Sequence, residues 1–242
     1  MLNLRRLGLE WMKDATLLGV PHGKTALLCL GIAFLSAGSA FSSWPEFALS
    51  TGCYSGSAYG TQASPAVAFD GTNFLVVWED ERINNGRDIF GARVSAQGEI
   101  LDPTGIPIST ASNMQVSAKV AWGGQNYLAV WADYRNGNYD VYGARISPGG
   151  TVLDPDGFPI STGPGSKAFP DLSWDGTNFL VVWSDDRNES SSNDIYGARV
   201  TPAGQVIDGS GIRISSASLS DIYPSISYNG TEYLVAWEQS GG

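Results

Sequence analysis

Histidine and cysteine are nearly absent from the sequence. Its 242 residues contain one histidine, His22, and two cysteines, Cys29 and Cys53. His22 and Cys29 lie in an N-terminal segment that differs from the rest of the chain and that we predict to be removed. The remaining chain therefore cannot form a Ser-His-Asp or Cys-His catalytic site, a histidine-ligated zinc or iron centre, or an internal disulfide. Any catalysis must use carboxylates, tyrosine, arginine, serine or the two remaining lysines, Lys119 and Lys167.

Long apolar runs are scarce as well. Residues 26–35 form an apolar stretch that is well short of the ~20 residues needed to span a bilayer. Four Lys and Arg residues precede this stretch, and the small residues 36–40 follow it. That order is typical of a secretory signal peptide. We predict a signal peptide over residues 1–40 with cleavage after Ala40, and an uncleaved N-terminal anchor is the alternative.

Positive charge is scarce in the rest of the chain. Without residues 1–40, ten Lys and Arg stand against 22 Asp and Glu, which gives a net charge of −12. Binding to nucleic acid or to an anionic membrane requires clustered Lys and Arg, whereas these cations are few and scattered. We therefore expect no nucleic-acid partner and no membrane contact beyond the signal peptide. The composition suits a protein that is secreted or held at the cell surface.

A five-residue apolar run that ends in tryptophan occurs four times. The tryptophans are spaced 53, 52 and 54 residues apart, at Trp78, Trp131, Trp183 and Trp237. A fixed period of this length is typical of repeat proteins, in which one small unit buries its faces against its own copies. The chain is therefore predicted to be a repeat protein.

Each repeat contains the pattern of four antiparallel strands. Two apolar runs flank an Asp-Gly, Gly-Gly or Asn-Gly turn, a strand of the type Asp-Ile-Tyr-Gly-Ala-Arg-Val follows, and a fourth element ends each unit. Four antiparallel strands in each unit of ~52 residues make a propeller blade. We predict an all-β fold, a β-propeller with three full blades and partial blades at both ends, as a fragment of a longer propeller. The predicted units are a lead-in at 41–64 with a blade-like outer strand at 47–51, blades at 65–113, 114–166 and 167–219, and an incomplete blade at 220–242.

The composite repeat resembles a known group of sequences. Its pattern is aromatic-Leu-Val-Val-Trp-x-Asp-x-Arg, then Asp-Ile-Tyr-Gly-Ala-Arg-Val, then Gly-Ile-Pro-Ile-Ser. This is similar to the tandem-repeat β-propeller segments of large exported bacterial proteins, over residues 47–242. The resemblance implies a surface or extracellular protein and no particular reaction.

The most prominent carboxylates recur once per blade. Asp80, Asp133 and Asp185 each stand two residues after a tryptophan and two residues before an arginine. Because an enzyme has one active site, the repetition indicates Asp-Arg pairs that support the fold. Asp154 and Asp156 resemble part of a calcium loop without its full ligand spacing, so we predict no metal and keep calcium as an alternative.

Functional residues are expected where the repeats differ, in the loops after the second strand and between blades. Aromatic, amide and cationic side chains in these loops suit a glycan or protein ligand. The candidates are Arg87, Tyr134, Asn136, Asn138, Tyr139 and Lys167. The leading interpretation is a non-catalytic extracellular binding or spacer module. The alternative is a carbohydrate-active enzyme, which needs two facing carboxylates. No unpaired carboxylate pair stands out from the repeats; Asp171 and Glu79 at non-repeating positions are candidates to contribute, and further blades could hold the rest.

Overall fold

The computed structural model describes residues 60–83, 86–189, 192–216 and 218–240, and a short ladder between β1 (Gly31–Ile32) and β2 (Phe47–Ala48). The predicted signal peptide at 1–40, its cleavage site and the predicted outer strand at 47–51 lie outside the described residues, except for these four. The same holds for residues 41–46 and 49–59 of the predicted lead-in.

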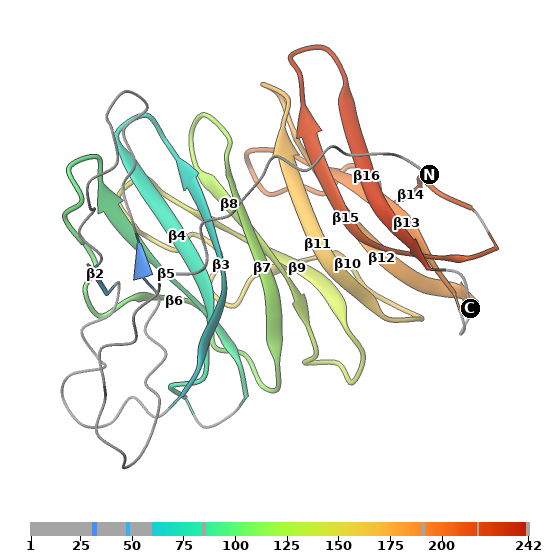
Figure 1. Cartoon of the computed structure of the whole chain (residues 1–242), viewed down its shortest axis with the longest axis horizontal. Coiled ribbons are helices and arrows are strands. Elements are labelled where there is room, and N and C mark those ends of the chain that lie inside the picture. The colour runs from blue at the N-terminus through green and yellow to red at the C-terminus, as the bar shows by residue number, and fades with distance from the viewer. Residues whose placement is uncertain are drawn as a thin grey trace, which may run out of the picture.

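The described chain folds into four consecutive antiparallel sheets, which follow one another from cyan to red in Figure 1. The first contains β3 (Gln62–Phe69), β4 (Asn73–Asp80), β5 (Asp88–Ser95) and β6 (Ile106–Ser109). The second contains β7 (Gln115–Trp122), β8 (Tyr127–Asp133), β9 (Asp140–Ile146) and β10 (Phe158–Ser161). The third contains β11 (Lys167–Trp174), β12 (Phe179–Glu189), β13 (Ser192–Val200) and β14 (Ile212–Arg213). The fourth pairs β15 (Ser220–Tyr228) with β16 (Tyr233–Ser240).

In each sheet the strands pair in the order in which they occur in the chain. The all-β class and the four-stranded blades predicted from sequence are confirmed. The first strand of the first blade begins at Gln62, three residues before the predicted start at Pro65. In the part of the chain that the structure describes, no helix is long and apolar enough to cross a bilayer.

In three of the four sheets, the turn between the first two strands closes through hydrogen bonds to the side chain of its first residue. In the first blade, Oδ1 of Asp70 accepts hydrogen bonds from the backbone N–H groups of Thr72 and Asn73, both at 2.7 Å. Gly71, which follows Asp70, has a φ of 97°, a value that an L-residue adopts only at a cost in free energy. Asp175 and Asn229 make the same bonds in the third and fourth sheets.

The second strand of each full blade is the buried centre of its sheet. In the second blade, Trp131 is fully buried, and its Nε1 donates to Oδ2 of Asp133 at 2.8 Å. Arg135 forms two hydrogen bonds to the same carboxylate and lies over the ring of Tyr142. Gly157 faces the indole so closely that a methyl group there would lie 2.5 Å from Cη2 of Trp131. The same tryptophan-aspartate-arginine unit recurs in the first and third blades, which confirms the structural role predicted for these repeated carboxylates.

Neighbouring sheets pack face to face through apolar side chains. Leu75, Val77 and Ile89 of the first sheet form one cluster with Val120 and Trp131 of the second. The hydroxyl of Tyr127 donates across this junction to the carbonyl of Asn73 at 2.9 Å. At the two ends of the array the equivalent faces have no neighbouring sheet among the described residues. Val67 in the first sheet is accordingly 60% exposed, and Leu234 in the last is 72% exposed. Burial thus depends on the neighbouring sheet rather than on the residue type.

Candidate functional site

The first strands of the four sheets form the inner wall of the array. β3 contacts β7, β7 contacts β11, and β11 contacts β15. Each of these inner strands begins on the face of the molecule that carries the β4–β5, β8–β9 and β12–β13 loops, which we call the loop face. The opposite face carries the tight turns between the first and second strands.

Every inner strand has a β-bulge near its start. The pairing with the second strand shifts in register between Ala63 and Ala66 in β3, and at the corresponding places in the other three strands. At each bulge one residue other than glycine has a positive φ, between 52° and 58°: these residues are Ser64, Ser117, Phe169 and Tyr223. The left-handed conformation costs roughly 1–2 kcal/mol for an L-residue. The fold repeats this cost in all four sheets, so the bulge is a feature of the blade, and the side chains at the four bulges, which differ, set the character of this wall.

The bulges surround a pocket of about 350 Å³, which we call the inner-strand pocket. It is lined by Ser64, Pro65, Ser117, Ala118, Lys119, Phe169, Pro170, Tyr223 and Pro224. The rings of Phe169 and Tyr223 lie against each other, with centroids 4.2 Å apart and planes tilted by 48°. Tyr223 is 49% exposed, so part of this aromatic surface faces solvent. The pocket therefore combines a tilted pair of aromatic rings with the hydroxyls of Ser64, Ser117 and Tyr223 and one ammonium group.

Lys119 differs from every other cation that follows residue 40. Nine of those ten Lys and Arg side chains form ion pairs within 4.0 Å of a carboxylate: Arg82, Arg87, Arg93, Arg135, Arg145, Lys167, Arg187, Arg199 and Arg213. Lys119 has no such partner among the described residues, and it is exposed on the inner wall. In a chain with 22 carboxylates in this region, an unpaired cation in a pocket is an unusual feature.

Two carboxylates flank the inner-strand pocket. Glu79 of β4 is 3% exposed, and its Oε1 accepts a hydrogen bond of 2.8 Å from the backbone N–H of Ser117, a pocket residue. Its Oε2 accepts a bond of 2.8 Å from Arg87. Asp171 directly follows the pocket residue Pro170, and its Oδ2 accepts a bond of 3.0 Å from the backbone N–H of Ile226.

These two carboxylates are not present in every copy of the repeat. Where the first blade has Glu79, the second and third blades have Ala132 and Ser184, and the two-stranded fourth sheet has Glu238. Where the third blade has Asp171, the second has Lys119 and the first has Ala66. Side chains that differ between copies at the same place in the fold are not needed to form a blade. Glu79 and Asp171 are therefore two carboxylates close to the pocket that a blade does not require.

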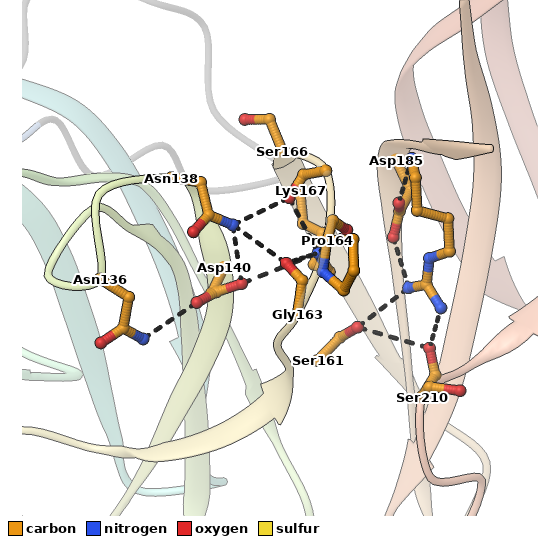
Figure 2. Close-up of polar contacts among 12 residues, drawn as sticks. Asn136, Asn138, Asp140, Ser161, Gly163, Pro164, Ser166, Lys167, Asp185 and Ser210 are labelled. Atoms are coloured by element: carbon orange, nitrogen blue, oxygen red, sulfur yellow. Dashed lines mark hydrogen bonds and ion pairs between the residues drawn. The ribbon is translucent and has the colours of Figure 1, made fainter. Parts of the chain in front are cut away.

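Lys167, a candidate from the sequence, is buried in the protein (Figure 2). Its Nζ donates to the carbonyls of Gly163, Pro164 and Gly165 at 2.9–3.1 Å and lies 3.7 Å from Oδ1 of Asp140. Burial lowers the pKa of its ammonium group, against the effect of nearby carboxylates. Lys167 thus holds the connection between the second and third blades, and its ammonium group has no free position for a ligand.

Asn136 and Asn138 belong to the same network as Lys167. Asn138 donates to the carbonyls of Gly163 and Gly165 at 3.2 and 2.9 Å, and both amides donate to the carboxylate of Asp140. The structure therefore brings three of the six predicted ligand-binding residues together around Asp140 (Figure 2). Their hydrogen bonds are used to order the loop.

Tyr134 and Tyr139 form an aromatic pair in the same loop, with ring centroids 5.0 Å apart in an edge-to-face arrangement. Tyr134 is 39% exposed. Neither ring is among the residues that line the inner-strand pocket. The pair offers an apolar surface on the loop face without a convergent set of polar groups.

Arg87, the sixth candidate, lies in the first blade and is bound to two carboxylates. It donates to Glu79 and Glu81 at 2.8 and 2.9 Å. The hydrogen bond from Arg87 lowers the pKa of Glu81, and the same pairing raises the pKa of Arg87 itself. Arg87 reaches the inner-strand pocket only through Glu79, which it orients.

The weak calcium candidates turn towards different partners. Asp154 pairs with Arg145 at 2.8 Å, whereas Oδ1 of Asp156 accepts a bond from the backbone N–H of Thr110. Across the described residues, no group of three or more His, Cys, Asp or Glu side chains is placed to hold a metal ion. The two side chains thus act in loop structure and in contact between blades.

The inner-strand pocket was missed by our reasoning from sequence. We looked for variation in the loops, but the pocket side chains vary inside the inner strands, within otherwise similar segments. Aligning the four strands shows Ser, Ser, Phe and Tyr at the bulge position, and Ala, Lys, Asp and Ser two residues later. That variation was the available signal.

No family model and no curated protein matches the sequence. The fold is similar to solved structures. An alpha-L-arabinofuranosidase from Lactobacillus brevis has a TM-score of 0.52 at 10% identity, over 81% of this chain and 71% of that chain. A thermostable family-43 glycoside hydrolase has a TM-score of 0.51 at 16% identity, over 81% of this chain and 72% of that chain. The GH93 alpha-L-arabinofuranosidase of Fusarium graminearum, in complex with arabinobiose, has a TM-score of 0.53 at 10% identity, over 75% of this chain and 57% of that chain.

These similarities correct one prediction from sequence. We expected above all a non-catalytic binding or spacer module, but the similar structures are, by their names, glycoside-cleaving enzymes. The non-catalytic interpretation is therefore wrong, and the alternative of a carbohydrate-active enzyme is favoured. At 10–16% identity the likeness shows the fold alone, so the function has to be argued from the residues of this chain.

Proposed function

We propose that this chain is part of a carbohydrate-active enzyme of the glycoside hydrolase type, with the inner-strand pocket as its substrate site. The observation that carries the proposal is the convergence of four bulged strands on a pocket with an aromatic wall and polar groups. Sugar rings present apolar C–H faces and a rim of hydroxyls. Such rings suit a site that combines an aromatic surface with a few placed polar groups.

The two flanking carboxylates supply the groups that glycoside hydrolysis requires. One carboxyl group protonates the leaving oxygen, while the other activates water or attacks the sugar. Glu79 bonds to the backbone of a pocket residue in the second blade, and Asp171 follows a pocket residue in the third. The strand that carries Lys119 lies between the strands that carry them, so the two side chains come from different blades. Both accept hydrogen bonds from backbone N–H groups of the neighbouring blade, which fixes where each carboxylate lies.

The chain itself excludes the other common hydrolytic arrangements. No histidine lies beyond residue 22, so a serine or cysteine nucleophile would have no imidazole base. The repeated aspartates in the described blades are already bound to tryptophan and arginine. Among the described residues, Glu79 and Asp171 are carboxylates that lie next to residues of the pocket and are replaced in other full blades.

Substitution of the two carboxylates tests the proposal. Purified protein is assayed on a panel of aryl glycosides, including arabinofuranosides, and on plant polysaccharides, with released sugar as the readout. Glu79→Gln and Asp171→Asn keep the size and the hydrogen-bond acceptor of each side chain. Each is expected to lower kcat by about 10²–10⁴-fold, as loss of a general acid or base does.

Glu99→Gln is the matched control, because Glu99 is exposed and lies between the third and fourth strands on the opposite face. Circular dichroism melts establish that each variant is folded. Turnover that is unchanged in both pocket variants, or no turnover by the parent protein on any member of the panel, would contradict the proposal.

Export of the protein is a further part of the proposal. It is supported by the short apolar segment at 26–35, the small residues up to Ala40 and the acidic remainder of the chain. Expression in a secreting host should yield a product that begins after Ala40, measured by intact mass. Secreted material that retains residues 1–40 would contradict this.

A further inference from the structure

We infer that the inner-strand pocket selects an anionic sugar unit, carboxylated or sulfated, through the ammonium group of Lys119. This inference rests on the proposed function, because it names the substrate class of the same pocket. Nine of the ten cations beyond residue 40 are neutralised by ion pairs, and the remaining one lines the pocket.

The inner strands contain two lysines, of which Lys167 is buried and Lys119 is exposed. Lys167 begins β11 and is fully buried, with three carbonyls and Asp140 around its ammonium group. The first residues of β3 and β7, Gln62 and Gln115, likewise donate their side-chain amides to backbone carbonyls of the preceding segment. Lys167 thus takes the place of a structural glutamine. Lys119 has no such task, because its repeat equivalents are an alanine, an aspartate and a serine.

The charged groups near Lys119 are bound elsewhere. Glu79 is held by Arg87 and by the backbone N–H of Ser117, and Asp171 accepts a bond from the backbone N–H of Ile226. Lys119 is the one charged residue among the described residues that line the pocket itself. Asp171 keeps its negative charge next to the pocket, so a ligand meets the positive charge of Lys119 only in direct contact with it.

The remaining lining residues fit a sugar that carries this charge. The tilted pair of Phe169 and Tyr223 offers an apolar wall for the C–H face of a ring, and Ser64 and Ser117 add hydroxyls. A lysine acts on an anion as a point charge with three donors, so it suits a carboxylate or a sulfate without fixing the shape of the group. The overall acidity of the chain would repel such a glycan at long range. Binding should therefore depend on this single contact at short range.

Matched probes separate charge from the remainder of the sugar. Binding is measured by calorimetry with tetramers of galacturonic and of glucuronic acid, and with their methyl esters, which lack the charge. A sulfated carrageenan tetrasaccharide and its desulfated form make the second arm. At low ionic strength, at least one charged probe is expected to bind about five- to tenfold more tightly than its uncharged partner. The arm in which this occurs identifies the anion.

Variants taken from the repeat itself test the contact. Lys119→Ala introduces the residue of the first blade and should abolish the preference for the charged probe, whereas Lys119→Arg should keep most of it. Tyr223→Ser introduces the residue found at the same bulge in the first two blades. It should weaken charged and uncharged probes alike, because it removes the stacking surface.

Equal affinity for each charged and uncharged pair would overturn the inference, as would a preference that survives Lys119→Ala or the absence of binding by every charged probe. These outcomes leave the proposed function standing if neutral glycosides are still hydrolysed in a Glu79-dependent way. Conversely, a Lys119-dependent preference in a protein that hydrolyses no glycan would support the inference and remove the proposed hydrolysis.

Discussion

Replacing Trp131 by alanine, compared with the same change at Trp237, tests how the blades are held together. Both residues end the second strand of a repeat. Trp131 is fully buried between neighbouring sheets, whereas Trp237 in the last sheet is 38% exposed. The pair therefore separates the contribution of the residue type from that of the neighbouring sheet.

The expected losses follow from burial. A buried tryptophan removes ~200 Å² from water, and at ~25 cal/mol per Å² this gives about 5 kcal/mol, part of which the alanine retains. Trp131→Ala also removes the hydrogen bond to Asp133, worth about 1 kcal/mol, although Arg135 still satisfies that carboxylate. We expect Trp131→Ala to lower the free energy of unfolding by about 4 kcal/mol, within the range for large-to-small core changes.

Trp237→Ala should cost about 2 kcal/mol, because over a third of the side chain is already in water and no enclosed cavity is left. The residue two places after Trp237 is Gln239 rather than an aspartate, and Gln239 donates to Asp221. The indole therefore lacks the carboxylate partner that the first three tryptophans have.

Urea unfolding followed by far-ultraviolet circular dichroism measures both changes. The comparison is valid if the three proteins show single transitions with similar slopes. Equal losses below about 1 kcal/mol at both positions would refute the reasoning, since a fully buried ring cannot be removed at so small a cost. A larger loss at Trp237 than at Trp131 would equally contradict it.

Two further predictions concern the same scaffold. Gly157→Ala should destabilise the protein by ~2 kcal/mol more than Gly124→Ala, measured by thermal or urea unfolding. Both glycines have a positive φ, but only the methyl group at 157 meets Trp131, and nothing lies within 4 Å of one at 124. Similar losses would show that the backbone alone sets the cost. The hydrogen bond from Arg145 lowers the pKa of Asp154 below its usual 3.8, so this pair stabilises the fold above that pH and its contribution is lost as the pH falls through the lower folded value. Asp154→Asn should therefore lower stability at pH 7 and flatten the loss of stability below pH 4, and an unchanged acid profile would count against this pairing.

The pattern within each repeat was enough to predict the scaffold. The Asp-Gly turn at Asp70 closes through hydrogen bonds that span three residues, so its signal is local. The spacing of Trp131, Asp133 and Arg135 likewise defines a unit within five residues. Residues 65–69 of the first strand could be predicted, but its start at Gln62 could not, because the bulge at Ser64 leaves no clear mark in a single copy.

The candidate site depends on contacts that no single repeat contains. The inner-strand pocket is built by residues ~53 positions apart in the chain, and their bulges give no turn signal of the Gly or Asx type. Placing the functional residues in the loops led us to Asn138 and Lys167, whose hydrogen bonds hold the loop. Sequence composition could not reveal that these polar groups would satisfy one another.

The two lysines beyond residue 40 show which properties the sequence predicts and which depend on the tertiary structure. From the sequence, Lys119 and Lys167 are the same chemical group, and we expected Lys167 in a loop between blades, whereas the structure places both on the first strand of a blade. The repeat period determined the blades, and the near absence of histidine excluded chemistry that needs this residue. Only the tertiary structure decided that Lys167 would be enclosed by carbonyls and that Lys119 would line a pocket with no ion-pair partner among the described residues. The physical reason is that burial and charge pairing arise between sheets, from side chains that meet only after the blades have packed.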